Sequence, residues 1–263
     1  DGKIYCIPYE NISAKYVTGF RKDWLVKVGV ELKDEYTLSE LKEILTAFAQ
    51  QDPDGNGKDD TYGLNGYGGT WNQSLMAIFG AFGGQPGQYY LNGDQQFYAF
   101  NVSDDFRAAL TYVRSLWVER LIDPEFFVAA NDQKLTKMVN SQAGYFSGWW
   151  STPRSLFQNG IQELTPEADF QRVQYNTDGR PLYTSIFYGI ASTQAQLEYG
   201  AELETFTTSK VAEFITGETP ITDETWSAYC QEWVNKGGQK VLESYAEAYN
   251  KLHGTAYTVA AAQ

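Results

Sequence analysis

Residues 52 to 60 read Asp-Pro-Asp-Gly-Asn-Gly-Lys-Asp-Asp, and this run constrains the fold around it more than any other segment does. Oxygen-bearing side chains stand at its first, third, fifth and ninth positions, which are Asp52, Asp54, Asn56 and Asp60. Gly57, at the sixth position, permits a sharp turn, and the seventh residue, Lys58, offers its backbone carbonyl. Calcium prefers a loose cage of oxygen ligands, so the pattern indicates a Ca²⁺ loop.

The run departs from an EF-hand loop at its end. The twelfth position is Gly63, so the bidentate glutamate that completes such a loop is absent. We therefore expect a structural Ca²⁺ in a larger domain instead of a calcium sensor. The alternative is an ordinary turn, because Asp, Asn and Gly dominate turns.

Composition excludes several classes of function. The chain has 263 residues, 43% of them hydrophobic, which is enough for a substantial core. Its formal net charge of −13 argues against nucleic acid or an anionic membrane surface as partner. The single histidine, His253, excludes a Ser-His-Asp triad and a multi-histidine zinc site as main hypotheses.

Cys6 and Cys230 lack metal-ligand spacing, and we expect buried free thiols, with a disulfide as the alternative.

Hydrophobic periodicity predicts strands and helices that alternate along the chain, with no internal repeat. Strands are expected at 3–7, 16–20, 61–64, 96–100 and 143–146, with further strands within 170–190 that include 185–188. Helices are expected at 21–29, 37–50, 75–82, 104–121, 133–140 and from 203 onward. Thr37 and Glu40 have capping-box spacing at the start of the second helix. This alternation predicts an α/β fold, and no apolar run approaches the ~18 residues of a membrane span.

Two glycine-flanked segments carry the candidate ligand surface. The first places two rings and two amides on a loop that enters a helix: Tyr67, Trp71, Asn72 and Gln73. The second places two indoles and a guanidinium at the end of a strand: Trp149, Trp150 and Arg154. Indole faces cover the C–H face of a sugar, and amides bond its hydroxyls, so the pattern favours a carbohydrate site. The alternative is that these aromatics only build a core, which we expect for Trp24, Trp117, Trp226 and Trp233.

The chain resembles the extracellular solute-binding proteins of ABC importers, the group that includes maltose-binding protein. The similar segments span nearly the whole chain and are 1–9, 21–29, 37–41, the loop 52–60, 80–84, 121–127 and 143–150. It looks most like the long lipoprotein-type members with a calcium loop, including binders of alginate oligosaccharides.

The resemblance implies a class II periplasmic-binding-protein fold, with two α/β lobes that close on a ligand at a hinge. It adds Tyr9, Glu10 and Tyr188 to the predicted ligand set. It also adds Thr61 to the predicted cation ligands, at a position where the family commonly has glutamate. Residues 1–184 would form the second lobe, 185–205 a remnant of the first and 206–263 C-terminal helices that pack on the second. Most of the first lobe would lie outside this sequence.

The leading hypothesis is therefore an extracellular oligosaccharide-binding component that delivers its ligand to ABC permease subunits. It would be held at the cell surface by an N-terminal lipid anchor outside this sequence, and the alternative location is the periplasm. One alternative is a receptor of this fold for a peptide or another solute, because fold does not fix the ligand. A less favoured alternative is a calcium-stabilised carbohydrate-active enzyme that uses Glu10, since glycosidases need two carboxylates and few lie near the aromatic segments.

Overall fold

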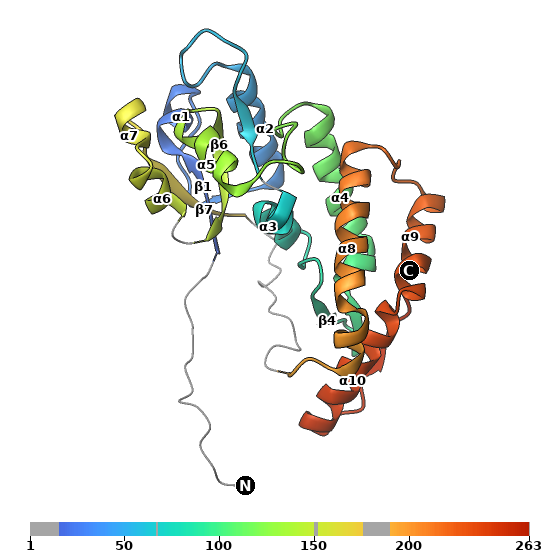
Figure 1. Cartoon of the computed structure of the whole chain (residues 1–263). Helices are drawn as coiled ribbons and strands as arrows, with labels where there is room; N and C mark the ends of the chain where they lie inside the picture. The colour runs from blue at the N-terminus through green and yellow to red at the C-terminus, as the bar shows by residue number, and fades with distance from the viewer. Residues whose placement is uncertain (1–15, 67, 150–151, 176–189, 263) are drawn as a thin grey trace, which may run out of the picture.

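The computed structural model describes residues 16–66, 68–149, 152–175 and 190–262. Two parts lie side by side: a sheet with its covering helices, and a group of long helices (Figure 1). Helix α3 (Trp71–Ala81) lies between them in the picture. The mixture of helices and sheets confirms the predicted α/β class.

The main sheet has five strands in the order β2-β7-β1-β6-β3. Its central strand, β1 (Tyr16–Arg21), is antiparallel to both neighbours, β6 (Ala143–Trp149) and β7 (Phe170–Tyr175). The outer strands β2 (Glu35–Tyr36) and β3 (Tyr62–Leu64) run parallel to β7 and β6. Apolar residues of β1 and β6, such as Phe20 and Tyr145, are buried. The sheet therefore brings together segments that are far apart in the sequence.

Helices α1 (Lys22–Lys27) and α2 (Leu38–Gln50) pack on this sheet. The predicted capping box of α2 is confirmed: Thr37 Oγ1 accepts from the Glu40 N–H, and Glu40 accepts from the Thr37 N–H. Aromatic rings of the two helices pack against each other: the Trp24 and Phe48 rings meet edge to face, with their centroids 5.2 Å apart. Gly144 permits this approach, because a Cβ there would lie 2.4 Å from both rings.

Shorter helices complete the sheet part and its second, smaller core. They are α5 (Asn131–Val139), α6 (Thr152–Gln158) and α7 (Ile161–Leu164). Met138, Phe146, Leu156 and Ile161 bury their side chains in this core.

The second part consists of α4 (Asp104–Val118), α8 (Gln194–Thr216), α9 (Asp223–Asn235) and α10 (Gly238–His253). It carries a small sheet of β4 (Tyr89–Leu91), β5 (Gln96–Ala99) and β8 (Thr258–Val259). Two 3₁₀ turns, η1 (Gly68–Thr70) and η2 (Phe100–Val102), lead into α3 and α4. Trp226 and Trp233 are buried as expected, while Trp117 is only partly buried. Cys230 is a buried free thiol, as predicted, and Cys6 lies outside the described residues.

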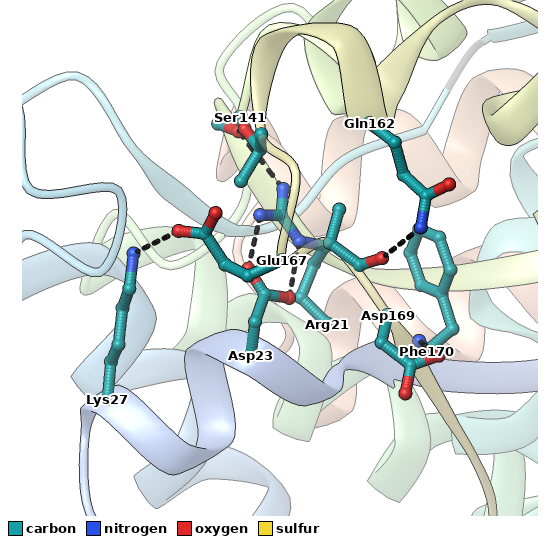
Figure 2. A network of polar contacts seen from close by, with 10 residues as sticks. Arg21, Asp23, Lys27, Ser141, Gln162, Glu167, Asp169 and Phe170 are labelled. Carbon is teal, nitrogen blue, oxygen red and sulfur yellow. Dashed lines mark hydrogen bonds and ion pairs between the residues drawn. The ribbon is translucent and has the colours of Figure 1, made fainter.

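A buried ion pair joins β1 to its neighbours (Figure 2). The Arg21 side chain is fully buried, and its Nε donates to Asp23 Oδ1 at 2.8 Å. Its Nη1 donates to Ser141 Oγ at 3.1 Å, in the turn between α5 and β6. Lys27 and Glu167 continue the network at the surface. One guanidinium thus holds the end of β1, the start of α1 and the turn before β6 together.

Several element boundaries differ from the sequence expectation. Helix α3 begins at Trp71, so Trp71, Asn72 and Gln73 lie in its first turn and not in a loop. Helix α4 ends at Val118, before the buried Leu121. Helix α8 begins at 194 and crosses the predicted domain boundary at residue 205. The strands expected at 3–7 and 185–188 lie outside the described residues. Within the described part of the chain, none of the helices has the length and apolarity of a membrane span.

Candidate functional site

A cavity of about 320 Å³ opens between the first turn of α3, the segment 86–89 and one face of α8. Backbone of Gly68, Gly69 and Gly87 contributes to its wall, so little side-chain volume fills it. Its lining residues are Gly68, Gly69, Trp71, Asn72, Pro86, Gly87, Gln88, Tyr89, Asn101, Gln196, Gly200, Leu203, Glu204, Thr207, Thr208 and Trp233. Amide and hydroxyl side chains outnumber the others, and aromatic rings stand among them. Such a lining can bond the hydroxyl groups of a small polar ligand.

Trp71 is a wall of this cavity and not an exposed stacking platform. Only 6% of the residue is exposed, and its ring meets Phe79 edge to face at 5.9 Å. The indole Nε1 donates to Thr208 Oγ1 at 3.2 Å, which links α3 to α8. Burial of the indole is favourable because its one polar atom has this partner. The side chain therefore fixes the distance between the two walls of the cavity.

Asn72 and Gln73 follow on the same turn. Asn72 is exposed at the cavity, and its Oδ1 accepts from the Gln73 N–H at 2.9 Å. Gln73 is half-buried and does not line the cavity, but its backbone carbonyl accepts from Ser147 Oγ at 2.8 Å. The start of α3 is thus bonded directly to the end of β6, where the second predicted ligand segment begins.

A buried lysine of α5 forms hydrogen bonds to both α3 and β6. Lys134 of α5 is 5% exposed, and its Nζ donates to Ser74 Oγ at 3.2 Å and to the Ser147 carbonyl at 3.1 Å. Burial lowers the pKa of Lys134 to about 8, because a low-dielectric environment disfavours the ammonium form. Ser147 of β6 therefore bonds to α3 through its hydroxyl and to α5 through its carbonyl.

The other predicted ligand residues are distributed as follows. Trp149 ends β6, with its backbone paired to Tyr16 of β1. Arg154 is exposed on α6 and does not line the cavity. Tyr9, Glu10, Tyr67, Trp150 and Tyr188 lie outside the described residues. The cavity thus brings together Trp71 and Asn72 from the predicted set, and Arg154 stands apart from it.

Sequence reasoning missed the wall that α8 supplies. Gln196, Gly200, Glu204 and Thr208 follow one another at four-residue spacing, so they lie on one face of the helix. This polar stripe interrupts an otherwise amphipathic pattern and is the signal that could have pointed to it. Pairing that stripe with Trp71, more than a hundred residues earlier, needs the tertiary structure.

The Asp-rich loop lies between α2 and β3. Its carboxylates gather around one residue: Asn56 Nδ2 donates to Asp54 Oδ2 at 2.7 Å and to Asp60 Oδ1 at 3.0 Å. Asp52 accepts from the N–H groups of Asn56 and Gly57 at 3.0 and 2.9 Å. Asp52, Gly55 and Gly57 all have positive φ, so the chain turns tightly. Backbone N–H groups of the loop thus face the Asp52 carboxylate, an arrangement that an ordinary turn also has.

Charge in this loop is crowded. Burial, a hydrogen bond with Asp52 and the charge of Asp60 raise the pKa of Asp54. The Gly57 N–H bond lowers the pKa of Asp52. The all-oxygen donor set suits Ca²⁺. Over the described ranges, however, no three His, Cys, Asp or Glu side chains stand in a geometry that would hold a metal ion.

The Thr61 hydroxyl and the backbone N–H of Lys58, whose carbonyl is the predicted ligand atom, form other bonds in this structure. Thr61 is 4% exposed, and its hydroxyl donates to the Phe48 carbonyl of α2 at 2.8 Å. Lys58 donates its backbone N–H to Asn56 Oδ1 at 2.7 Å. Thr61 therefore ties the loop to α2, and its role as a cation ligand stays a prediction.

Comparison with known proteins gives sequence relatives of one class. The chain is 32% identical over 146 residues to lipoprotein LipO of Bacillus subtilis, covering 55% of this chain and 28% of LipO. It is 29% identical over 160 residues to FusA of Streptococcus pneumoniae, named a fructooligosaccharide ABC transporter substrate-binding protein, covering 57% and 29%. The chain thus spans less than a third of the length of these curated relatives. No family model matches it.

Solved structures agree on the fold. The alginate-binding protein AlgQ2, without calcium ion, superposes with a TM-score of 0.68 at 13% identity, over 95% of this chain and 75% of AlgQ2. An HMO-binding solute-binding protein from Bifidobacterium longum infantis superposes with a TM-score of 0.67 at 14% sequence identity. The match covers 90% of this chain and 74% of that protein. An EF-hand mutant of FusA in complex with fructo-nystose superposes with a TM-score of 0.65 at 16% sequence identity. The match covers 92% of this chain and 73% of the FusA mutant. The chain therefore has the fold of the solute-binding proteins of ABC transporters, and one of its sequence relatives, FusA, is named a substrate-binding protein.

Proposed function

We propose that this chain is part of a substrate-binding component of an ABC importer that captures an oligosaccharide. The observation that carries the proposal is the cavity between α3 and α8, which a buried Trp71 holds open and amide and hydroxyl groups line. A glycan offers many hydroxyls, each able to donate and accept, and such a lining can bond them on several sides. The names of relatives such as FusA support a carbohydrate over a peptide.

In the proposed mechanism, the glycan bonds to this lobe and to a partner lobe and favours their closed arrangement. A ligand shifts such an equilibrium only through its differential affinity for the closed state. The permease subunits would recognise that closed state. The domain limits 1–184, 185–205 and 206–263 belong to the same proposal. A lipid-anchored, extracellular location also belongs to it, and the lipoprotein name of one relative supports that location.

Isothermal titration of the full-length protein against neutral and acidic oligosaccharides tests this function. We expect one glycan class to bind with a Kd in the micromolar range or below, without turnover of the glycan. Absence of binding across the panel, with the protein folded by circular dichroism, would contradict it. Release of shortened products would instead favour the enzyme alternative.

We also propose that the Asp-rich loop binds Ca²⁺ through Asp52, Asp54, Asn56, the Lys58 carbonyl and Asp60, with Thr61 beside them. Support comes from the oxygen-only donor set and from the solved neighbours, among them an EF-hand mutant of FusA. Bound Ca²⁺ would neutralise the crowded carboxylates and fix the junction of α2 with β3.

A further inference from the structure

We infer that the cavity between α3 and α8 selects oligosaccharides without acidic groups, neutral or amine-bearing, over uronic-acid oligosaccharides. This inference rests on the proposed function and names the chemical class of its ligand. It concerns the charge of the cavity wall, which the names of the relatives leave open, since one is said to bind polygalacturonan and another carries a fructooligosaccharide name.

Among the described residues, the cavity wall carries one charged side chain, and that charge is negative. Of the residues that line the cavity, Glu204 is the only acidic one, and the described lining includes no Lys, Arg or His. A carboxylate ligand is normally held by Arg or Lys, which supply charge-assisted hydrogen bonds. This wall offers a carboxylate ligand only amides and hydroxyls, together with a like charge.

Glu204 is free to meet a ligand. It is exposed on the face of α8 that lines the cavity, and it forms no hydrogen bond or ion pair with any residue in the described part of the chain. Among the described residues, therefore, no neighbour neutralises its charge. Sugar hydroxyls can donate to this carboxylate, which gives a bond stronger than one between neutral groups.

Three lysines on or near α8 have partners outside the cavity. Lys236 pairs with Glu202 at 2.8 Å, and Lys210 pairs with Glu213 at 2.8 Å. Lys240 stands over the Tyr199 ring and donates to its hydroxyl at 3.3 Å. None of these side chains lines the cavity. The one arginine of the predicted ligand set, Arg154, is on α6 and outside the lining.

The volume makes this charge decisive. A cavity of about 320 Å³ is at the small end of ligand sites, so a bound sugar ring lies within a few ångströms of Glu204. Two like charges at ~4 Å repel by about 1 kcal/mol even in bulk water, and more beside a protein wall. An added uronate carboxylate should therefore weaken binding by about tenfold or more.

Matched trisaccharides test the inference on the full-length protein. Galactotriose and trigalacturonate share ring and linkage and differ in the carboxylate, and mannotriose and a mannuronate trimer form a second pair. Isothermal titration at pH 7 in low salt should give a Kd at least tenfold lower for the neutral member of the pair that binds. High salt should narrow the gap, because salt screens exposed charges.

Two variants locate the effect. Glu204→Gln keeps the shape and should reduce the neutral-to-acidic preference to less than threefold. Glu198→Gln makes the same charge change on an exposed residue of α8 outside the lining, and it should leave the preference unchanged. Both positions are exposed, so both variants should fold.

Tighter binding of an acidic member than of its neutral partner would overturn the inference while the proposed function stands. An unchanged preference in Glu204→Gln would also overturn it. Failure of all the glycans in the wider panel to bind would reject the proposed function itself, and the inference with it.

Discussion

At the scale of single residues, the buried pair of Arg21 and Asp23 should matter most for stability. Their side chains are 0% and 5% exposed, so removing one partner leaves a charge buried without compensation. We expect Asp23→Ala to lower the free energy of unfolding by about 3 kcal/mol or more. Urea denaturation followed by circular dichroism measures this loss.

Asp169→Ala provides the matched control from the same network (Figure 2). Asp169 pairs with Lys22 at 3.2 Å, but both side chains are largely exposed, so this pair contributes about 1 kcal/mol or less. Equal losses in the two variants would show that burial does not govern the Arg21 pair.

Lys134 should give the protein a stability that rises with pH in the alkaline range. Its pKa is about 8 in the folded protein and near 10.5 when unfolded. Between these values the unfolded state binds more protons, so the free energy of unfolding increases with pH there. The full gain, of the order of 3 kcal/mol, is reached above pH ~10.5 and is absent below pH ~8.

Lys134→Met isolates this effect. The other titratable groups are common to both proteins, so their contributions cancel when the free energy of unfolding of the variant is subtracted from that of the wild type. Denaturation at several pH values from 7 to 10 should show the wild type gaining stability relative to the variant. A constant difference over this range would contradict the shifted pKa.

At the scale of elements, the Asp52–Asp60 loop should couple Ca²⁺ to the α2–β3 junction. We expect millimolar Ca²⁺ to raise Tm by about 5 °C, because a ligand at 100 times its Kd stabilises by about 2.7 kcal/mol. A chelator should reverse the shift, and glycan affinity should change only secondarily, since none of the predicted cation ligands lines the cavity.

Asp54→Ala should abolish the response to Ca²⁺, because Asp54 is a predicted ligand. Asp59→Ala removes the same charge from the same loop at a position outside the ligand pattern, and it should retain the response. An unchanged Tm in excess chelator for the wild type would contradict the role of the loop.

Elements with local signals were predictable from the sequence. The α2 start follows from Thr37 and Glu40, which bond each other within four residues of chain. The α3 start was missed although Thr70 and Gln73 have capping-box spacing, because the glycines at 66, 68 and 69 indicate a loop and the 3₁₀ turn Gly68–Thr70 precedes the helix. Trp71 therefore looked like a loop residue, although tertiary packing on Phe79 and Thr208 buries it in a helix.

At the scale of the whole molecule, ligand binding should stabilise both parts together. The cavity wall combines α3 with α8, so a bound glycan bridges segments that are distant in the sequence. Saturation at 100 times Kd should add about 2.7 kcal/mol to the free energy of unfolding. Hydrogen exchange should slow in both helices; protection confined to one of them would contradict a shared site.

The fold class was predictable at this scale, and the complete site was not. Alternating periodicity indicates α/β layers from local sequence alone. From the sequence alone, Glu204 looks like one more polar residue on the exposed face of a helix. Only the packing of α8 beside α3 makes it part of a cavity wall. A site that joins residues 71 and 204 depends on contacts that no local pattern encodes.

The position of β1 has a consequence for the order of folding. Thr18 pairs with Ser147, 129 residues later, and with Val173 on its other side. The central strand therefore has neither neighbour until residues as far as β6 have emerged from the ribosome. Such high contact order slows folding, because a long loop must close before the pairing is gained. Until then the backbone N–H and C=O groups of strand 16–21 have no strand partner, and we expect the nascent chain to be prone to self-association during this interval.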